Sequence, residues 1–274
     1  MRLVDSHCHL QAAAFATDRA EVVAAARRAG VERIVAPGWD LASSQASLAL
    51  VAADPAIGAA VGIHPHHAAE IDEAAWAEVE ALAADPRVVA IGETGLDYDR
   101  AFAPREAQLA NLRRHLSLTR QTGKPAILHC RSRAGRRDAQ DDLLAELRAA
   151  GSGGQGGGGA FGQGDPPALL HSFSGPLDYA IAALELGLMI SFSGLVFRTG
   201  EEVSAEVARL VPDDRLLVET DAPYLAPPGA SKRRNEPRWV EVTARWLAGQ
   251  RGIDPDLLGA QLVANHDRAF GGRP

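Results

Sequence analysis

The sequence predicts a (β/α)₈ barrel of the TIM type, formed as a single domain over residues 1–274. Three observations lead to this fold class. Short aliphatic or β-branched runs recur at near-regular intervals, longer segments with helical spacing lie between them, and 274 residues suffice for one large core. Such alternation predicts parallel strands joined by crossover helices. Eight units in about 250 residues fit a closed barrel better than an open doubly wound sheet of roughly five to seven strands.

The predicted strands are short runs of buried character, at Leu3–Asp5, Arg33–Ala36, Ala59–Ile63, Val88–Ile91, Ala126–Leu128, Ala168–Leu170, Leu188–Ser191 and Leu216–Val218. Apolar residues at helical spacing predict helices between them, at Asp18–Ala29, Leu41–Ala53, Glu73–Ala84, Pro104–Thr122 and Pro176–Leu186. A helix over Pro237–Gln250 and a short pair after Pro255 are expected to complete the C-terminal side.

One segment differs from the rest in composition. Between Gly151 and Gly164, nine of the 14 residues are glycine and no apolar residue recurs at helical spacing. A phosphate-binding loop would end in Lys-Ser or Lys-Thr before a helix, and this segment does not. We therefore predict a mobile loop.

The bulk properties limit the classes of function. A formal charge of -7 and a pI near 5.7 exclude an extended basic surface, so any contact with nucleic acid must be local. No apolar run approaches the roughly 20 residues of a membrane span, and no signal region is evident, which predicts a cytoplasmic protein without a membrane partner. Cys8 and Cys130 are expected to be reduced thiols.

Polar residues follow strand after strand, at the barrel edge where enzymes of this fold place their chemistry. His7 and His9 end the first predicted strand and share a face, because residues i and i+2 of an extended segment point the same way. Each polar residue alone could be a satisfied core histidine or a salt-bridged carboxylate. Together they predict a metal site, with the ligands His7, His9, Glu93, His129, His171 and Asp221.

Six nitrogen and oxygen donors exceed the needs of one tetrahedral zinc ion, so two divalent cations are expected, with Glu93 as the carboxylate that bridges them. Two cations about 3.5–4 Å apart stabilise the attacking and leaving oxygens and activate water, which is hydrolytic chemistry. Mg²⁺, Mn²⁺ and Zn²⁺ all remain open, because histidine and carboxylate ligands accept each of them.

The same edge carries further candidates. His64 follows the third predicted strand and is expected to bind a substrate phosphate or to protonate a leaving group, whereas His66 and His67 are expected in a solvated loop. Two basic runs in an acidic protein favour an anionic substrate such as a phosphodiester backbone: Arg131, Arg133, Arg136 and Arg137, and Lys232, Arg233, Arg234 and Arg238.

A series of motifs, taken in order, resembles the TatD family of metal-dependent deoxyribonucleases: DSHCHL at Asp5–Leu10, GIHPHHA at Gly62–Ala68, IGETGLDY at Ile91–Tyr98, KPAILHCR at Lys124–Arg131, LLHSFSG at Leu169–Gly175, SFSGLVF at Ser191–Phe197 and LLVETDAPYLAP at Leu216–Pro227. RRNEP at Arg233–Pro237 and NHDRAF at Asn265–Phe270 are similar to the family's closing motifs. The match covers nearly the whole chain. The Gly-rich insertion departs from the family, which runs more directly between these strands.

The resemblance implies a two-metal phosphodiesterase on an amidohydrolase-like barrel, typically a 3′-to-5′ exonuclease acting on DNA. The substrate is expected to be single-stranded DNA or DNA 3′ ends, with no obligate protein partner. Carried over by position, His7, His9, Glu93 and Asp221 hold one metal, and Glu93, His129 and His171 the other. Asp221 also orients or deprotonates water, His64 contacts the scissile phosphate, and Glu219 supports the ligands from behind. Of the two basic runs, Arg131, Arg233 and Arg234 are the residues expected to bind the substrate.

Two other functions are compatible with a barrel of this type. A hydrolase of a small amide, lactone or phosphoester commonly bridges its metals with a modified lysine, where this sequence offers Glu93. A catalytically silent binding barrel predicts a gap in the ligand set, and the sequence shows none.

Overall fold

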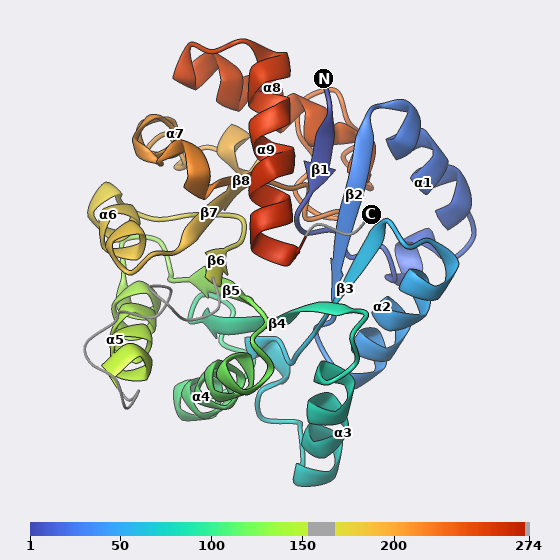
Figure 1. Ribbon diagram of the computed structural model, residues 1–274. Helices are drawn as coiled ribbons and strands as arrows, with labels where there is room; N and C mark the ends of the chain where they lie inside the picture. The colour runs from blue at the N-terminus through green and yellow to red at the C-terminus, as the bar shows by residue number, and fades with distance from the viewer. Residues whose placement is uncertain (153–167, 272–274) are drawn as a thin grey trace.

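The computed structural model describes residues 1–152 and 168–271 and confirms the predicted barrel fold. Eight parallel strands follow one another in sequence order around a centre, with helices on the outside (Figure 1). The strands are β1 (Leu3–Asp5), β2 (Val31–Pro37), β3 (Ile57–Val61), β4 (Val88–Asp97), β5 (Ala126–Arg131), β6 (Ala168–Leu170), β7 (Met189–Phe192) and β8 (Leu216–Val218). The α-helices are α1 (Arg19–Arg28), α2 (Leu41–Ala53), α3 (Glu73–Ala83), α4 (Arg105–Thr122), α5 (Asp138–Ser152), α6 (Leu177–Glu185), α7 (Ser204–Leu210), α8 (Val240–Arg251) and α9 (Pro255–Phe270).

Backbone hydrogen bonds between the first and last strands close the barrel. The Ser6 amide donates to Val218 O at 3.0 Å, and beyond the strands the Asp221 amide donates to His7 O at 2.8 Å. The His9 amide donates to Ala222 O, also at 2.8 Å. The segments that carry His7, His9 and Asp221 are therefore fixed to one another.

The barrel interior is filled by one apolar residue or pair from each of the strands β2 to β8, with the end of α9 beneath them. This cluster comprises Val35, Ala60, Val89, Ala90, Ile127, Leu169, Met189, Leu217, Ala269 and Phe270. Alternate strand residues, such as Ile34 and Leu128, belong instead to the larger cluster under the helices. In Figure 1, α9 crosses the barrel near β1 and β8.

Helix boundaries follow local signals where these are strong. Asp40 caps α2 by accepting from the Ser43 amide at 2.7 Å, and the Ser43 hydroxyl accepts from the Asp40 amide in return. Gly123 ends α4 with a φ of 68°, as glycine does at a helix C-terminus. The prediction of a short helix pair after Pro255 is wrong, because α9 is one continuous helix of 16 residues.

Only the beginning of the predicted Gly-rich loop lies within the described residues. Gly151, expected to begin the loop, lies inside α5, which ends at Ser152. Residues 153–164 of the predicted mobile loop lie outside the described residues. Among the described residues no helix is long and apolar enough to cross a membrane.

An irregularity in β4 places Glu93 at the centre of the barrel mouth. The pairing of β4 with β5 shifts register between Ile91 and Thr94, and the Glu93 amide donates across the barrel to Gly38 O at 2.9 Å. Gly92 has a φ of 134°, and a Cβ there would lie 2.6 Å from Ile127 O, so only glycine fits. The glycine at position 92 thus allows the irregularity that places the Glu93 carboxylate at the barrel mouth.

Candidate metal centre and active site

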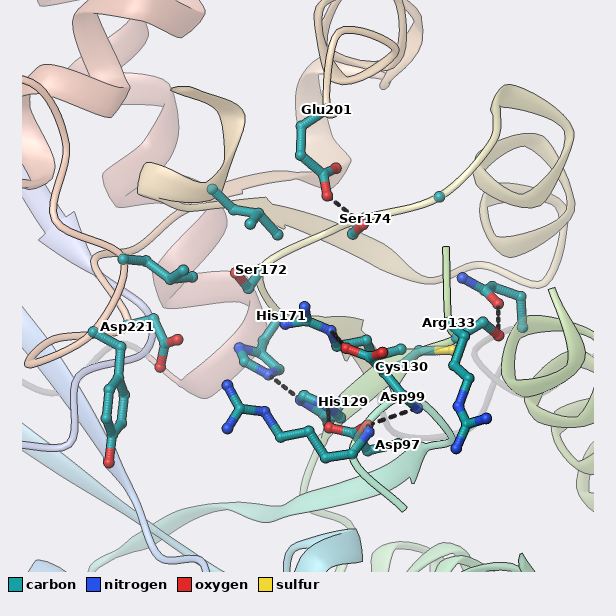
Figure 2. A pocket seen from close by; sticks show the side chains of 18 of the residues that line it. Asp97, Asp99, His129, Cys130, Arg133, His171, Ser172, Ser174, Glu201 and Asp221 are labelled. Carbon is teal, nitrogen blue, oxygen red and sulfur yellow. Dashed lines mark hydrogen bonds and ion pairs between the residues drawn. The ribbon is translucent and has the colours of Figure 1, made fainter. Parts of the chain in front are cut away.

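The six side chains predicted as metal ligands meet at the carboxyl-terminal edge of the barrel. They come from the end of β1, the irregularity in β4, β5, and the loops after β6 and β8. Figure 2 shows three of them, His129, His171 and Asp221, lining one pocket. Most of the six are buried, while the side chains of His129 and Asp221 keep 18% and 14% of their surface exposed toward that pocket.

The carboxylate of Glu93 lies between two groups of histidines. Its Oε2 lies 3.3 Å from His7 Nε2 and 3.6 Å from His9 Nε2. Its Oε1 lies 2.9 Å from His171 Nε2 and 3.2 Å from His129 Nδ1. Each oxygen therefore belongs to a different group of ring nitrogens, which is how a carboxylate that bridges two cations is arranged.

Asp221 completes the first group. Its Oδ1 lies 3.4 Å from His9 Nε2 and 3.8 Å from His7 Nε2, and those two ring nitrogens are 3.3 Å apart. The backbone of Asp221 has a φ of 53°, an uncommon conformation for a residue with a side chain and one that is concentrated at functional sites.

Oxygen acceptors behind three of the rings fix which nitrogen carries the proton. They form the following pairs: His129 Nε2 with Asp97 Oδ2 at 3.2 Å, His171 Nδ1 with Glu219 Oε1 at 3.1 Å, and His9 Nδ1 with Pro37 O at 3.2 Å. Because a carboxylate or carbonyl oxygen can only accept, these nitrogens donate. In a neutral ring the opposite nitrogen would then be free to bind a cation beside Glu93 or Asp221.

This donor set fits divalent cations. Nitrogen and oxygen ligands bind such cations at about 2.0–2.2 Å, so ligand atoms around one ion lie about 3.0–3.6 Å from one another. The nitrogen-to-oxygen separations around Glu93 range from 2.9 to 3.6 Å. Within the described residues, three overlapping groups of atoms could hold an ion: His7, His9 and Asp221; His7, Glu93 and His171; and His64, Glu93 and His129.

The electrostatics of the cluster follow from burial of carboxylates among imidazoles. Burial raises the pKa of Glu93, but the surrounding rings, led by His171, hold that pKa well below its ordinary value. Burial lowers the pKa of His171, while Glu93 and Glu219 raise it well above its ordinary value. The buried negative charge thus requires positive charge close by, and bound cations would replace the ring protons that supply it.

His64 lies beside the second group, where the sequence predicts a substrate contact. Its Nε2 lies 3.3 Å from Glu93 Oε1, and its Nδ1 accepts the His66 amide proton at 3.1 Å. Burial lowers the pKa of His64 to about 4, so the ring is neutral near pH 7. Its one proton therefore resides on Nε2 and points toward the cluster.

The prediction that His66 lies in a solvated loop is wrong. The His66 side chain is only 22% exposed, and its Nε2 lies 2.8 Å from Asp97 Oδ2. His67 is more exposed, at 36%, and pairs with Glu70 at the surface.

The cavity above the cluster has a volume of about 890 Å³, near the upper end of the roughly 300–1,000 Å³ of ligand pockets. Arg131, Arg133 and Arg136, from the first predicted basic run, line it, and Arg100 joins them. Arg131 lies 2.9 Å from Asp99. The fourth member of that run, Arg137, pairs with Asp141 and Asp178 instead.

The second basic run is not part of the cavity lining. Arg234 binds Asp18 at 2.8 Å and Glu236 at 2.9 Å, and its guanidinium covers the Phe15 ring. Arg238 pairs with Glu236 as well, and Arg233 is exposed to solvent. Carboxylates thus already occupy the guanidinium of Arg234, for which the sequence predicts a substrate contact.

The amino-acid sequence of this chain is similar to those of known proteins along nearly its whole length. The family model of the TatD related DNases matches residues 4–271. The chain is 36% identical to the 3′-5′ ssDNA/RNA exonuclease TatD of Erwinia billingiae and 32% identical to an uncharacterized metal-dependent hydrolase, YabD, of Bacillus subtilis, with 98% of each chain covered in both comparisons. The chain belongs to the TatD related DNase family.

A solved structure agrees with this placement. The TatD homologue YJJV from Escherichia coli K12 superimposes with a TM-score of 0.86 at 26% identity, covering 99% of each chain. The resemblance read from the motifs is confirmed. The centre described above therefore lies at the carboxyl-terminal edge of a TatD-family barrel.

Sequence reasoning missed Asp97 as a functional residue of this TatD-family site. Asp97 Oδ2 accepts from both His66 and His129, and Oδ1 accepts the amides of Asp99 and Arg100 at 3.0 and 2.9 Å. The sequence feature that could have identified Asp97 is its position in the motif IGETGLDY, four residues after Glu93 on the same strand. Only the structure shows that it fixes His129.

Proposed function

We propose that this TatD-family protein is a metal-dependent nuclease that hydrolyses DNA phosphodiester bonds from the 3′ end, with two divalent cations at the Glu93 cluster. The observation that carries the proposal is the division of the Glu93 carboxylate, with Oε2 facing His7 and His9 and Oε1 facing His129 and His171. One carboxylate shared between two nitrogen-rich groups is a ligand arrangement for a pair of ions.

We assign the ligands in two sets that share Glu93. The first set is His7, His9, Glu93 and Asp221, and the second is Glu93, His129 and His171. When bound, divalent cations supply positive charge to phosphate oxygens and lower the pKa of water toward neutrality. The donor set of histidines and carboxylates accepts Mg²⁺, Mn²⁺ and Zn²⁺ alike.

The side chains around the cations act on the phosphate and on water. His64 directs its Nε2 proton into the pocket, and we assign it to a phosphate oxygen. Burial raises the pKa of Asp221, but the hydrogen bond from His9 lowers it below its ordinary value, so the carboxylate is ionised. An ionised carboxylate at this position can orient water and accept its proton.

Positive charge on the rim suits the phosphodiester backbone. Arg131 lines the cavity with two further arginines of its run, and we assign it to the substrate backbone. Arg233, exposed and outside the cavity lining, is assigned at most to a remote part of a longer strand. We do not assign Arg234 to substrate, since Asp18 and Glu236 hold it.

The relatives support the direction of cleavage. Several curated relatives at 34–36% identity are named 3′-5′ ssDNA/RNA exonuclease, which favours single-stranded substrates. The small-molecule alternative predicts a lysine at the bridging position, where the structure has Glu93. Action in the cytoplasm stays a prediction from the sequence.

The test is digestion of single-stranded DNA labelled at the 5′ or the 3′ end, with Mg²⁺, with Mn²⁺ and with EDTA. A ladder that shortens from the 3′ end with metal, and no digestion with EDTA, is the expected result. Cleavage of small esters or amides without any cleavage of DNA would overturn the proposal in favour of a small-molecule hydrolase.

A further inference from the structure

Two aromatic side chains stand exposed in the lining of the cavity. Phe102 is 68% exposed and Tyr224 is 59% exposed, although both contribute to the pocket that holds the metal-ligand cluster. Large apolar rings are normally buried, because the free energy falls when apolar surface leaves water. Two of them at the mouth of a polar, charged cavity indicate a surface that a ligand covers.

The two rings flank the cluster from opposite sides. The Phe102 ring packs edge-on against His66 at 4.8 Å, on the side of the second ligand group. The Tyr224 ring lies 5.9 Å from the His9 ring, on the side of the first group. Figure 2 shows the residues that precede them, with Asp221 at one side of the pocket and Asp97 and Asp99 at the other.

The loop that carries Phe102 is fixed by buried polar contacts. Asp97 accepts two amides of this loop, and the Gln108 side chain donates to Ala103 O at 2.8 Å. Ala101, directly before the ring, has a φ of 49°. The backbone is therefore held in an uncommon conformation beside a side chain that itself remains in solvent.

The loop that carries Tyr224 is fixed in a similar way. The Tyr224 amide donates to Asp221 O at 2.8 Å, and the Asn235 amide donates to Pro223 O at 2.9 Å. Leu225, directly after the ring, has a φ of 47°. Rings presented on rigid loops lose little conformational freedom when a ligand covers them, which favours binding.

Positive charge accompanies the rings. Arg100, two residues before Phe102, lines the same cavity as both rings. Among residues 1–152 and 168–271, Arg131 and Arg136 of the cavity arginines form ion pairs, whereas Arg100 and Arg133 form none. An arginine in the same cavity as two exposed rings suits a phosphate that joins two bases.

We propose that Phe102 and Tyr224 each stack one nucleobase, on either side of the phosphodiester bond at the Glu93 cluster. This inference rests on the proposed nuclease function and names its substrate requirement. Successive bases in a stacked strand are about 3.4 Å apart. Rings on opposite sides of the cluster accept neighbouring bases only when these are unstacked and splayed apart, which a paired duplex end does not allow.

The test measures how far the kcat/KM of ring variants falls on oligonucleotides with and without particular bases. The substrates are a 5′-labelled single-stranded oligonucleotide and two copies that lack the base of the 3′-terminal or of the preceding nucleotide. Phe102→Ala and Tyr224→Ala are each expected to lower kcat/KM on the intact oligonucleotide about tenfold. Each loss is expected to disappear on one of the two abasic oligonucleotides, a different one for each ring. Tyr224→Phe, which keeps the ring, restores the intact rate.

Leu257→Ala is the matched control, because Leu257 is also 68% exposed but lies on α9, outside the cavity. It is expected to cleave all three oligonucleotides as the parent does. Equal losses of the ring variants on intact and abasic oligonucleotides, or no loss on any of them, overturn the stacking proposal.

A binding experiment without cleavage tests the stacking proposal separately from the proposed nuclease function. Fluorescence anisotropy in EDTA measures the Kd of the same oligonucleotides without cleavage, and the ring variants are expected to bind the intact strand about tenfold more weakly. A parent protein that binds but never cleaves overturns the nuclease proposal, and the abasic comparison of Kd values then decides the stacking proposal alone. A parent that neither binds nor cleaves overturns both.

Discussion

The two oxygens of Glu93 face different groups of histidines, so this residue has no substitute within its cluster. Glu93→Ala removes the ligand that we assign to both cations, and we expect DNA hydrolysis to fall below detection while the fold is retained. Digestion of labelled single-stranded DNA and a thermal melt measure the two effects. Glu202→Gln, a change at an exposed carboxylate, is the control. Substantial residual activity of Glu93→Ala would rule out its bridging assignment.

Glu219 acts on the site through His171. Its Oε1 accepts the His171 Nδ1 proton at 3.1 Å, and its side chain is fully buried. Glu219→Gln keeps an acceptor but removes the charge, so His171 becomes a weaker donor to a cation. We expect the affinity for Mn²⁺ to fall about 10- to 100-fold, measured by calorimetric titration. An unchanged affinity would show that the charge of Glu219 does not reach the metal site.

At the scale of elements, the loop from β4 to α4 depends on one buried amide. The Gln108 side chain accepts the Asp97 amide at 2.8 Å and donates to Asp97 O and Ala103 O. Gln108→Ala leaves these groups unpaired, and we expect the free energy of unfolding to fall by about 1–3 kcal/mol, measured by urea denaturation. Gln121→Ala, on the exposed face of the same helix, is expected to change it by less than about 0.5 kcal/mol. Similar values for both variants would contradict this role of Gln108.

The sequence predicts strands and their polar ends well, because a barrel requires a buried run followed by a residue at its mouth. It fails where distant packing overrides a local signal. The sequence predicts a short helix pair after Pro255, yet α9 continues through Gly259, where a Cβ would lie 2.5 Å from Arg2 O and glycine allows close packing against the N-terminal segment. The prediction of a solvated loop at His66 fails because its hydrogen-bond partner, Asp97, lies 31 residues away in the sequence.

At the scale of the whole molecule, two histidines outside the metal cluster are buried and neutral. His115 in α4 accepts the Ile63 amide at 2.9 Å through Nε2, and burial lowers its pKa to about 4. His266 in α9 has no hydrogen-bond partner on either ring nitrogen among the described residues, and burial lowers its pKa to about 3. Both helices pack on the barrel, so protonation of either ring opposes the fold as a whole.

These two pKa values predict a loss of stability in mild acid. Because both lie below the ordinary value of 6.5, the unfolded chain binds more protons than the fold as the pH drops below 6.5. Their contribution to the free energy of unfolding is therefore complete above pH 6.5 and falls by about 3 kcal/mol for each ring by about pH 4.

His266→Phe isolates one of these contributions, because phenylalanine fills a similar volume and binds no proton. Urea denaturation at about pH 7 and about pH 4.5 is expected to show a drop in the free energy of unfolding that is about 2–3 kcal/mol smaller in the variant than in the parent. Phe270→Leu is the matched control, because Phe270 packs against His266 at 4.9 Å and carries no titratable group. It is expected to lower stability equally at both pH values. A drop in His266→Phe as large as that of the parent would show that the acid sensitivity arises elsewhere, for example from carboxylates whose ion pairs are lost on protonation.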